Sequence, residues 1–500
     1  MFDSNGGSKV AALRDIIVGS TITEPPEPTK AGFDFVGWYK NSALTTSWNF
    51  ATDTVTEDII LYAKWRERSS GIILIPSAIV QDENNAPIIV NGKTEFIAKR
   101  VTDTEEGKEI TRIIVDDKKM SEKIEQLGMF PKIVIPINTA SEIKIAKLNG
   151  QTVKNMEEKG VVFEIVTGEI TYTLPAAQIN IEKVSEEIGT KVELVDIDVI
   201  IKISDVSIDV QNMIRATAQK GNYEVITKPV EFSITCTSGD KIVDVSKFNK
   251  YVKRTIAIPS NAESGRITTG IVLNNNGTFS HVPTAIDIID GKYYAKINSL
   301  TNSVYSVIWS PKRFNDVEGH WSKAAVNDMG SRLVISGVGN EIFQPDKYIT
   351  RAEFAEIVVN GLGLKRIGTF KSSFDDVDNS AWYYNSVAIA SEYGLISGYN
   401  NKEFRPNDRI TREQAMTIIA KAMKITGLKV QFTIGEVEDI LKAFGDTEQA
   451  SYWSKESIAA CVKTGIVSGR NGHMIAPDGN MTRAETAVII RNLLKKSDLI

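Results

Sequence analysis

The sequence predicts a multidomain chain with a small β-rich module at the N-terminus, a β-rich α+β region in the middle, and an all-α, pseudo-threefold trimer of helical repeats at the C-terminus. Three observations support this. The chain has 500 residues, whereas a single hydrophobic core stops growing at about 250–300 residues. Strand-like runs of alternating or continuous apolar residues occur up to about residue 309. One motif then recurs three times, which indicates a repeat architecture.

Composition and charge exclude several classes of protein. The chain has 58 Lys and Arg against 63 Asp and Glu, a net charge of −5, so no basic field is present to bind nucleic acid. Its apolar stretches are shorter than the ~20 residues that span a bilayer, so we expect a soluble chain without membrane insertion. Cys236 and Cys461 are too few and too far apart for a disulfide scaffold or a metal knuckle.

The N-terminal module, residues 1–66, carries aromatic residues between Gly, Pro and Asn, as short strands and turns do. In so small a unit we favour the aromatics as core rather than as a binding face. The strings at 32–39, 48–50 and 61–65 resemble the Listeria-Bacteroides repeat, a β-grasp-like module of secreted bacterial proteins. The resemblance implies a spacer or adhesion unit. No secretory signal precedes it, so we expect residue 1 to be the edge of a longer protein.

The pattern of the middle region, residues 72–309, predicts strands with a few short helices, and turns at Gly-containing dipeptides such as Asn149-Gly150. It also predicts two subdomains that meet near residue 200. Strands are expected at 132–137, 161–166, 170–174, 230–235, 241–245, 293–297 and 305–309, and helices at 119–127, 182–188 and 209–219.

The middle region contains few residues that could form a catalytic or cofactor-binding site. No nucleophile elbow, zinc motif, phosphate loop or dinucleotide fingerprint occurs. His281 is the one histidine available for acid–base catalysis here, and we expect it to be solvated. The pairs Asp116/Asp117 and Asp196/Asp198 could flank a glycosidic bond, but strand alternation favours a solvated face. We therefore predict no catalytic residue, no metal and no cofactor.

The C-terminal repeats span residues 314–365, 374–428 and 444–495, with fixed spacings. Each has an Asp, a Trp, a Ser-Gly pair and an Arg, the Trp lying 30 residues and the Gly 14 residues before the Arg. In chain order these are Asp316, Trp321, Gly337 and Arg351, then Asp376, Trp382, Gly398 and Arg412, then Asp446, Trp453, Gly469 and Arg483.

Each repeat predicts a helical hairpin. Thr350 and Thr482 begin Thr-x-x-Glu capping boxes, which makes the Arg the first residue of the second helix. The apolar stripe behind it cannot be buried by one hairpin, so we expect three copies to close around a shared axis.

These motifs resemble the S-layer homology (SLH) domain of bacterial surface proteins. The resemblance implies a spindle with grooves between lobes, and noncovalent anchoring to secondary cell-wall polysaccharide, typically through a pyruvate ketal on N-acetylmannosamine. It places ligand contacts at the three Arg, the three Gly and the three Trp, and we add the three Asp to the polysaccharide-binding set. The chemistry is consistent, because a guanidinium binds a carboxylate bidentately and a helix N-terminus favours anions. The alternative is that the Trp are core and the Arg are merely solvated.

The copies differ in ways that leave the number of working grooves open. Copy two has Glu413-Gln414 where the others have Ala-Glu, from which we expect a weaker cap. Copy one has Leu333 where the others have Gly394 and Gly465, from which we expect an altered turn. About ten extra residues separate copies two and three.

The sequence therefore predicts a noncatalytic cell-surface or S-layer protein, extracellular at the cell wall, anchored to pyruvylated wall polysaccharide and capable of lateral self-association. The alternative is an SLH-anchored extracellular enzyme, such as a polysaccharide hydrolase, whose catalytic domain lies upstream or within residues 72–309.

Overall fold

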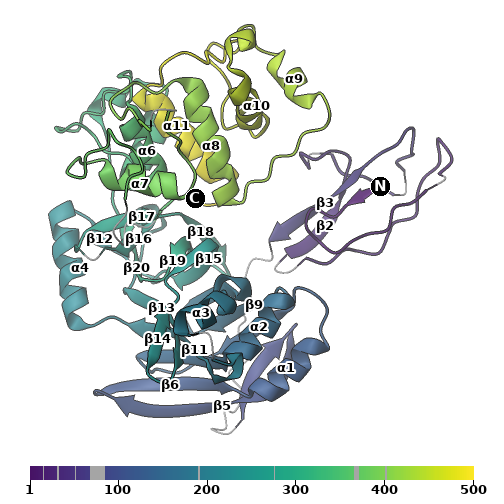
Figure 1. Ribbon diagram of the computed structural model, residues 1–500, viewed down its shortest axis with the longest axis vertical. Helices are drawn as coiled ribbons and strands as arrows, with labels where there is room; N and C mark the ends of the chain where they lie inside the picture. Colours follow the sequence, from purple (N-terminus) through teal and green to yellow (C-terminus); the bar gives the residue numbers. More distant parts are fainter. Residues whose placement is uncertain are drawn as a thin grey trace. The chain divides into compact units, whose positions relative to one another are not determined.

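A computed structural model describes residues 1–14, 16–30, 33–44, 46–50, 52–67, 85–189, 192–274, 276–364, 371–399 and 402–500. The chain divides into two compact units, one of residues 1–201 and 235–243, the other of residues 202–234 and 244–500. The middle of the chain is mostly β, and the C-terminal part is helical (Figure 1). No helix among the described residues is long and apolar enough to cross a membrane.

The N-terminal module is a small mixed sheet. Strands β1 (Phe2–Asp3), β3 (Leu61–Glu67) and β2 (Phe33–Tyr39) lie in that order, with β1 parallel and β2 antiparallel to β3. The buried residues include Phe2, Trp38 and Trp48, which confirms the aromatics as core. Gly32, the first residue of the predicted string 32–39, lies outside the described residues.

The rest of the first unit is a mixed sheet with helices. Its elements are β4 (Ala86–Val90), β5 (Lys93–Glu105), β6 (Lys108–Val115), α1 (Asp117–Glu125), β7 (Lys132–Pro136), β8 (Ile143–Asn149), α2 (Gly150–Glu158), β9 (Val162–Val166), β10 (Ile170–Pro175) and α3 (Ile181–Ile188). The pairs β9–β10, β4–β7, β4–β5 and β5–β6 are antiparallel, and the pairs β7–β9 and β6–β8 are parallel. The predicted strands at 132–137, 161–166 and 170–174 are confirmed.

The predicted turn at Asn149-Gly150 is wrong. Asn149 is the N-cap of α2, and its side chain accepts a hydrogen bond from the backbone N–H of Thr152 (2.8 Å). Asn suits turns and helix caps equally, because its short side chain bonds nearby backbone N–H groups in both. Because we assigned these two residues to a turn, the sequence analysis did not predict helix α2.

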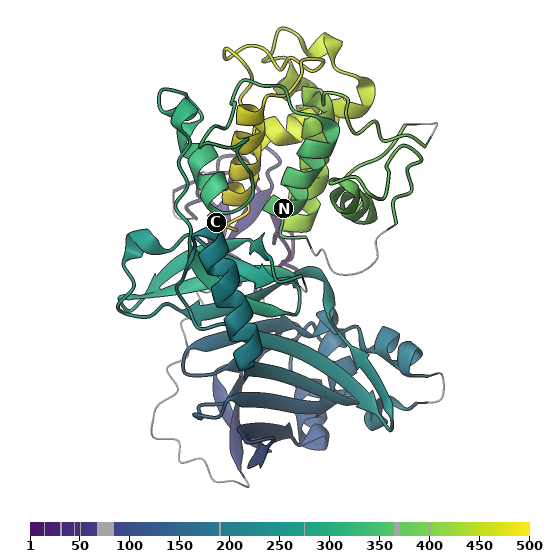
Figure 2. The same ribbon diagram turned by 90° about the vertical axis from the view of Figure 1, so that its left-hand side faces the viewer.

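The remaining middle elements are again mostly strands. They are β11 (Asp198–Asp205), α4 (Ile208–Gly221), β12 (Glu224–Val225), β13 (Val230–Ser238), β14 (Lys241–Asp244), β15 (Lys247–Ala257), β16 (Thr269–Leu273), β17 (Phe279–Val282), β18 (Thr284–Ile289), β19 (Lys292–Thr301) and β20 (Val304–Trp309). In the second unit α4 stands out as one long helix, at the front of Figure 2. His281 on β17 is 2% exposed and its Nδ1 lies 2.8 Å from Thr269 Oγ1. The expectation that His281 is solvated is therefore wrong.

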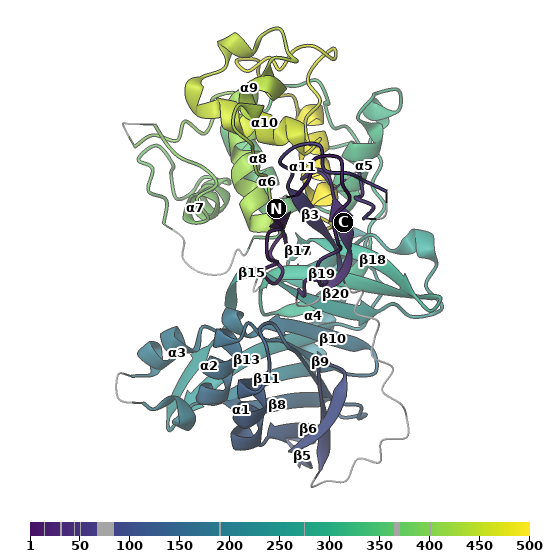
Figure 3. The ribbon, with the colours of Figure 1, turned by 90° about the vertical axis from the view of Figure 1, so that its right-hand side faces the viewer.

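The C-terminal region contains seven helices among its described residues: α5 (Lys323–Ser331), α6 (Arg351–Gly361), α7 (Tyr384–Glu392), α8 (Arg412–Thr426), α9 (Glu436–Leu441), α10 (Lys455–Lys463) and α11 (Arg483–Lys496). The second helices of the repeats, α6, α8 and α11, lie side by side (Figures 1 and 3). Each first helix packs on the second helix of the copy before it in a cycle, so that α7 contacts α6, α10 contacts α8 and α5 contacts α11. One core cluster contains residues from all three copies.

Two expectations about the copies are corrected. Gln414 makes a complete capping box with Thr411, as Glu353 does with Thr350, because an amide oxygen accepts the N-cap N–H as a carboxylate does. Leu333 adopts φ +62°, close to the +67° of Gly394, so the turn after the first helix is unchanged and copy one holds a bulky residue in the left-handed region.

Candidate functional site

The repeated arginines are buried between copies rather than solvated. As predicted, each begins the second helix of its repeat. Arg351, Arg412 and Arg483 are only 7%, 6% and 8% exposed. Burial lowers the pKa of all three guanidinium groups. The alternative of a merely solvated arginine is therefore wrong for these positions.

Each arginine reaches into the next copy. Nε donates to a backbone carbonyl: Arg351 to Phe404 (2.8 Å), Arg412 to Ile475 (2.7 Å) and Arg483 to Phe343 (2.8 Å). The contacts therefore run from copy one to two, from two to three and from three to one. In two of the three, Nη2 bonds the neighbouring Ser-Gly loop: Arg483 Nη2 donates to the carbonyl of Ser336 (2.6 Å) and Arg351 Nη2 to that of Ser397 (3.4 Å).

The three aspartates hold the carbonyls that receive the arginines. The carboxylate of Asp446 accepts from the backbone N–H groups of Ile475 (2.8 Å) and Ala476 (2.6 Å). Asp316 and Asp376 make the equivalent pairs of bonds in their own copies. With both oxygens bonded to backbone, each aspartate positions the site.

The glycines of the Ser-Gly pairs are required inside each copy. A Cβ at Gly337 would stand 2.6 Å from the ring of Phe314, and one at Gly398 would stand 2.5 Å from the ring of Phe374. At Gly469, φ is +83° and a Cβ would stand 2.9 Å from the carbonyl of Met474. Close packing under the loop therefore explains these glycines without any ligand.

The three tryptophans lie on the surface. Trp321, Trp382 and Trp453 are 66%, 65% and 55% exposed. Large aromatic side chains are highly buried on average, so three exposed indoles at one repeated position are unusual. The alternative that they form the core is wrong, and each offers an apolar face on which the C–H side of a sugar could stack.

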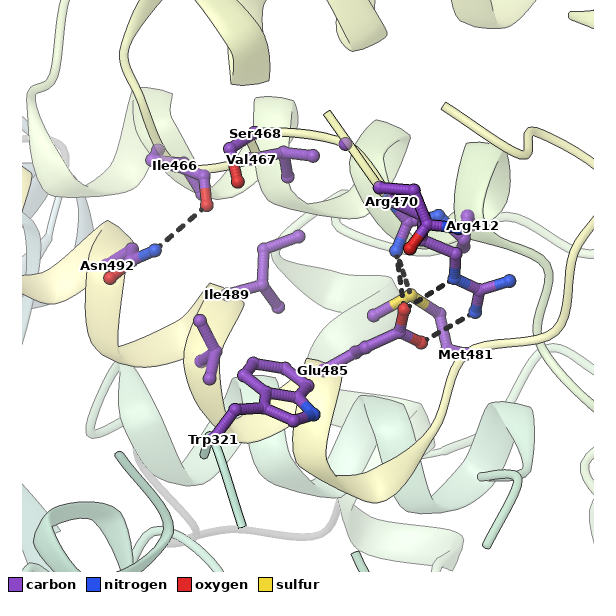
Figure 4. A pocket seen from close by; sticks show the side chains of 13 residues that line it. Trp321, Arg412, Ile466, Val467, Ser468, Arg470, Met481, Glu485, Ile489 and Asn492 are labelled. Carbon is purple, nitrogen blue, oxygen red and sulfur yellow. Dashed lines mark hydrogen bonds and ion pairs between the residues drawn. The ribbon is translucent and has the colours of Figure 1, made fainter. Parts of the chain in front are cut away.

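A cavity of about 490 Å³ brings these groups together at copy three. Figure 4 shows Glu485 pointing towards Arg412 and Arg470, with the indole of Trp321 beside it. Arg412 Nη1 donates to Glu485 (3.0 Å), and Arg470 donates to both oxygens of Glu485 (2.7 and 2.8 Å). The cavity thus contains side chains from all three copies.

Arg470 was missed by the sequence reasoning. It directly follows the Ser-Gly pair, where copies one and two have Val338 and Tyr399. Alignment of the three copies would therefore have shown a charged residue at this position in copy three only. Burial acts to raise the pKa of Glu485, but hydrogen bonds from Arg470 and Thr482 and the charge of Arg412 outweigh it and the pKa is lowered. Glu485 is therefore ionised at neutral pH.

Three of the four aspartates considered as candidate acids, Asp116, Asp117 and Asp198, make structural contacts. Asp116 caps α1 by accepting from the N–H of Lys119 (3.1 Å), and Asp117 accepts from the N–H of Asn149 (2.9 Å). Asp198 pairs with Lys147 (2.7 Å). Within the described residues, no group of three or more His, Cys, Asp or Glu is arranged to hold a metal ion.

Comparison with known families identifies both ends of the chain. Residues 1–64 match the Listeria-Bacteroides repeat domain, and residues 313–355, 373–416 and 443–487 match the S-layer homology domain. The chain therefore carries a Listeria-Bacteroides repeat and three SLH domains, as the sequence motifs predicted.

Related proteins are much longer than this chain. An amylopullulanase of Thermoanaerobacterium thermosulfurigenes is 28% identical over 359 residues, covering 69% of this chain and 18% of that protein. The exoglucanase XynX of Acetivibrio thermocellus is 34% identical over 199 residues, covering 40% and 18%. The surface-layer 125 kDa protein of Lysinibacillus sphaericus is 32% identical over 188 residues, covering 37% and 15%. The SLH domains and surface-layer relatives indicate an extracellular protein anchored at the cell wall.

Proposed function

We propose that the chain anchors a surface protein noncovalently to secondary cell-wall polysaccharide by binding a pyruvate ketal in the grooves between its SLH copies. The observation that carries this proposal is the cavity at copy three, which is lined both by Arg412, a guanidinium fixed at Nε, and by the exposed Trp321 of another copy. A guanidinium with Nη donors near a helix N-terminus suits a compact carboxylate.

The proposal also covers the arrangement of the repeats and the fold of the N-terminal module. Cyclic contacts among the copies support a pseudo-threefold helical trimer, and the mixed sheet of the N-terminal module supports a β-grasp-like unit. We propose the domain boundaries 1–66, 72–309, 314–365, 374–428 and 444–495. The N-terminal module and middle region are then what the anchor holds at the cell surface, and lateral self-association belongs to this surface role.

An anchored enzyme is the second candidate. The alignment to the amylopullulanase is longer than the whole chain from residue 310 to the C-terminus, so it includes part of the middle region. That region thus accompanies SLH domains in a hydrolase. The test is release of reducing sugar from pullulan and xylan by the whole chain. Hydrolysis abolished by substitution of a carboxylate in residues 85–309 would favour the enzyme.

Anchoring is tested by sedimentation with purified cell-wall sacculi from a pyruvylating strain and from a strain that lacks the ketal. Triple substitution of the exposed Trp321, Trp382 and Trp453 by Ala is expected to abolish binding without unfolding, because these side chains are mostly solvated. Substitution of the arginines is less informative, because their Nε groups hold the copies together.

The matched control is Phe96→Ala, which removes an exposed aromatic from the first unit and should leave binding unchanged. Wild-type binding should also weaken at high salt, since exposed parts of the ion pair are screened. Equal sedimentation with both kinds of sacculi would contradict recognition of the ketal.

A further inference from the structure

The three grooves are built alike but carry different charges. In copy three, Glu485, Val488 and Asn492 line the observed cavity; they lie two, five and nine residues after the arginine of the second helix. The same three positions in the other copies define the corresponding grooves. The guanidinium comes from the preceding copy. The groove of Arg351 has Gln414, Thr417 and Lys421; that of Arg412 has Glu485, Val488 and Asn492; that of Arg483 has Glu353, Glu356 and Asn360.

Arg351 has only neutral partners. Besides its bond to Phe404, Nη1 donates to the amide oxygen of Gln414 (3.2 Å) and Nη2 to the carbonyl of Ser397 (3.4 Å). The described residues give Arg351 no ion pair. A second cation stands at the same loop, because Lys421 Nζ donates to the hydroxyl of Ser397 (3.3 Å). Among the described residues, this groove therefore has two cations, and none of its three helix positions carries a carboxylate.

The other two grooves already contain anions. In the groove of Arg412, Glu485 pairs with both Arg412 and Arg470, so two cations face one carboxylate. In the groove of Arg483, Glu353 lies 3.9 Å from the guanidinium. Glu356, three residues further along that helix, accepts hydrogen bonds from Asn360 (3.1 Å) and from Ser386 of copy two. A carboxylate, that of Glu353, therefore already lies beside the arginine of that groove.

Charged residues at the rims of the grooves do not change which groove has the most positive side chains. Arg405 and Asp408 influence Arg351 with opposite sign. Lys347, at the corresponding rim position near Arg483, is exposed, as are Arg405 and Asp408, so solvent and salt screen all three. The groove residues are less exposed: Arg351 is buried and Lys421 is half-buried. Their charges therefore act more strongly on a ligand.

We propose that the groove of Arg351 and Lys421 is the high-affinity site for the anionic group of the wall polysaccharide, and that Gln414 determines this selectivity. The inference rests on the proposed function. A buried guanidinium without a carboxylate partner gains most from a ligand carboxylate. In the other grooves a ligand anion must face a carboxylate already bound to the arginine, and like charges repel.

The test exchanges one atom in each of two grooves. Gln414→Glu places a carboxylate beside Arg351, and Glu353→Gln removes one from beside Arg483. Both residue types already form the same capping box in this chain, so the helices should be retained, which circular dichroism checks. The probe is the methyl glycoside of N-acetylmannosamine carrying a 4,6-pyruvate ketal, titrated calorimetrically into the whole chain, with the ketal-free glycoside as its control.

The wild-type chain should show one class of tight site for the ketal glycoside. Gln414→Glu should weaken that site at least tenfold, while Glu353→Gln should add or strengthen a second site. Unchanged affinity in Gln414→Glu, or three equal sites in the wild type, would overturn the selectivity while leaving anchoring intact. Failure of the wild type to bind either the ketal glycoside or the pyruvylated sacculi would overturn the proposed function itself.

Discussion

At the scale of the residue, the repeated arginine serves the fold and the site with different atoms. Its Nε is used between copies, where Arg412 donates to the carbonyl of Ile475, while its Nη groups point to the groove. A buried guanidinium is costly unless its N–H groups are bonded. The structure meets that cost with carbonyls whose positions are set by the aspartates, so Asp446 and Arg412 act as a unit.

Asp446→Asn is expected to reduce the free energy of unfolding by about 1.5–3 kcal/mol, the range for a hydrogen bond to a charged group. Each oxygen of Asp446 now accepts from one N–H group, whereas an Asn would place an NH2 donor against one of these two donors. Urea denaturation followed by tryptophan fluorescence measures the change. The control is the exposed Asp439→Asn on α9, which should alter stability little; equal loss in both variants would contradict the positioning role.

At the scale of the element, β17 and α6 pack against each other within the second unit. His281 lies on β17 with Arg332 and Asp328 of the first repeat near it. Burial, and then the charge of Arg332, lower the pKa of His281 to about 3, while Asp328 acts the other way. The neutral imidazole is therefore part of the junction between the strands and the repeats.

This junction should make stability depend on pH. The folded pKa of about 3 lies below the ~6.5 of an unfolded histidine, so between these values the unfolded chain binds more protons. Stability is then full above pH ~6.5 and falls as the pH is lowered towards 3, by at most about 5 kcal/mol. Calorimetry at pH 7.0 and 4.5 measures the fall. In His281→Asn the dependence should be flatter, and an identical pH profile would contradict the assignment.

At the scale of the whole molecule, the copies close on one another through the backbone. The N–H of Ile349 donates to the carbonyl of Met481 (3.0 Å), that of Met481 to Ile410 (3.0 Å), and that of Ile410 to Ile349 (3.2 Å). Because these bonds form a ring, removal of one copy leaves donors, acceptors and an apolar face of each remaining copy without partners.

A chain ending at residue 428 is therefore expected to lose the folded state of copies one and two together. The removed part contains the carbonyl that binds Arg412 and the arginine that binds copy one. Limited proteolysis and far-ultraviolet circular dichroism compare it with the full chain. A chain starting at residue 85 is the control and should keep resistant repeats. Protease resistance at α6 and α8 in the shorter chain would show that the copies fold independently.

Much of the fold was predictable because its signals are local. Capping boxes at Thr350 and Thr482 and the predicted helix at 209–219 (α4) were confirmed. Errors arose where one residue type suits two local structures, as at Asn149, or where burial depends on distant partners, as at His281. The burial of the aromatic residues in the first 65 residues was also predictable, because so small a module needs them to form its core.

The sequence by itself determined the three repeats, their helix starts and the identity of the SLH domains, because spacing and capping chemistry are properties of neighbouring residues. Only the tertiary structure decided that the arginines are buried, that the tryptophans are exposed, and that each groove combines side chains from different copies. Charge balance in a groove depends on which copy's arginine meets which copy's Gln or Glu. That pairing follows from the cyclic packing, which residue spacing along the chain does not encode.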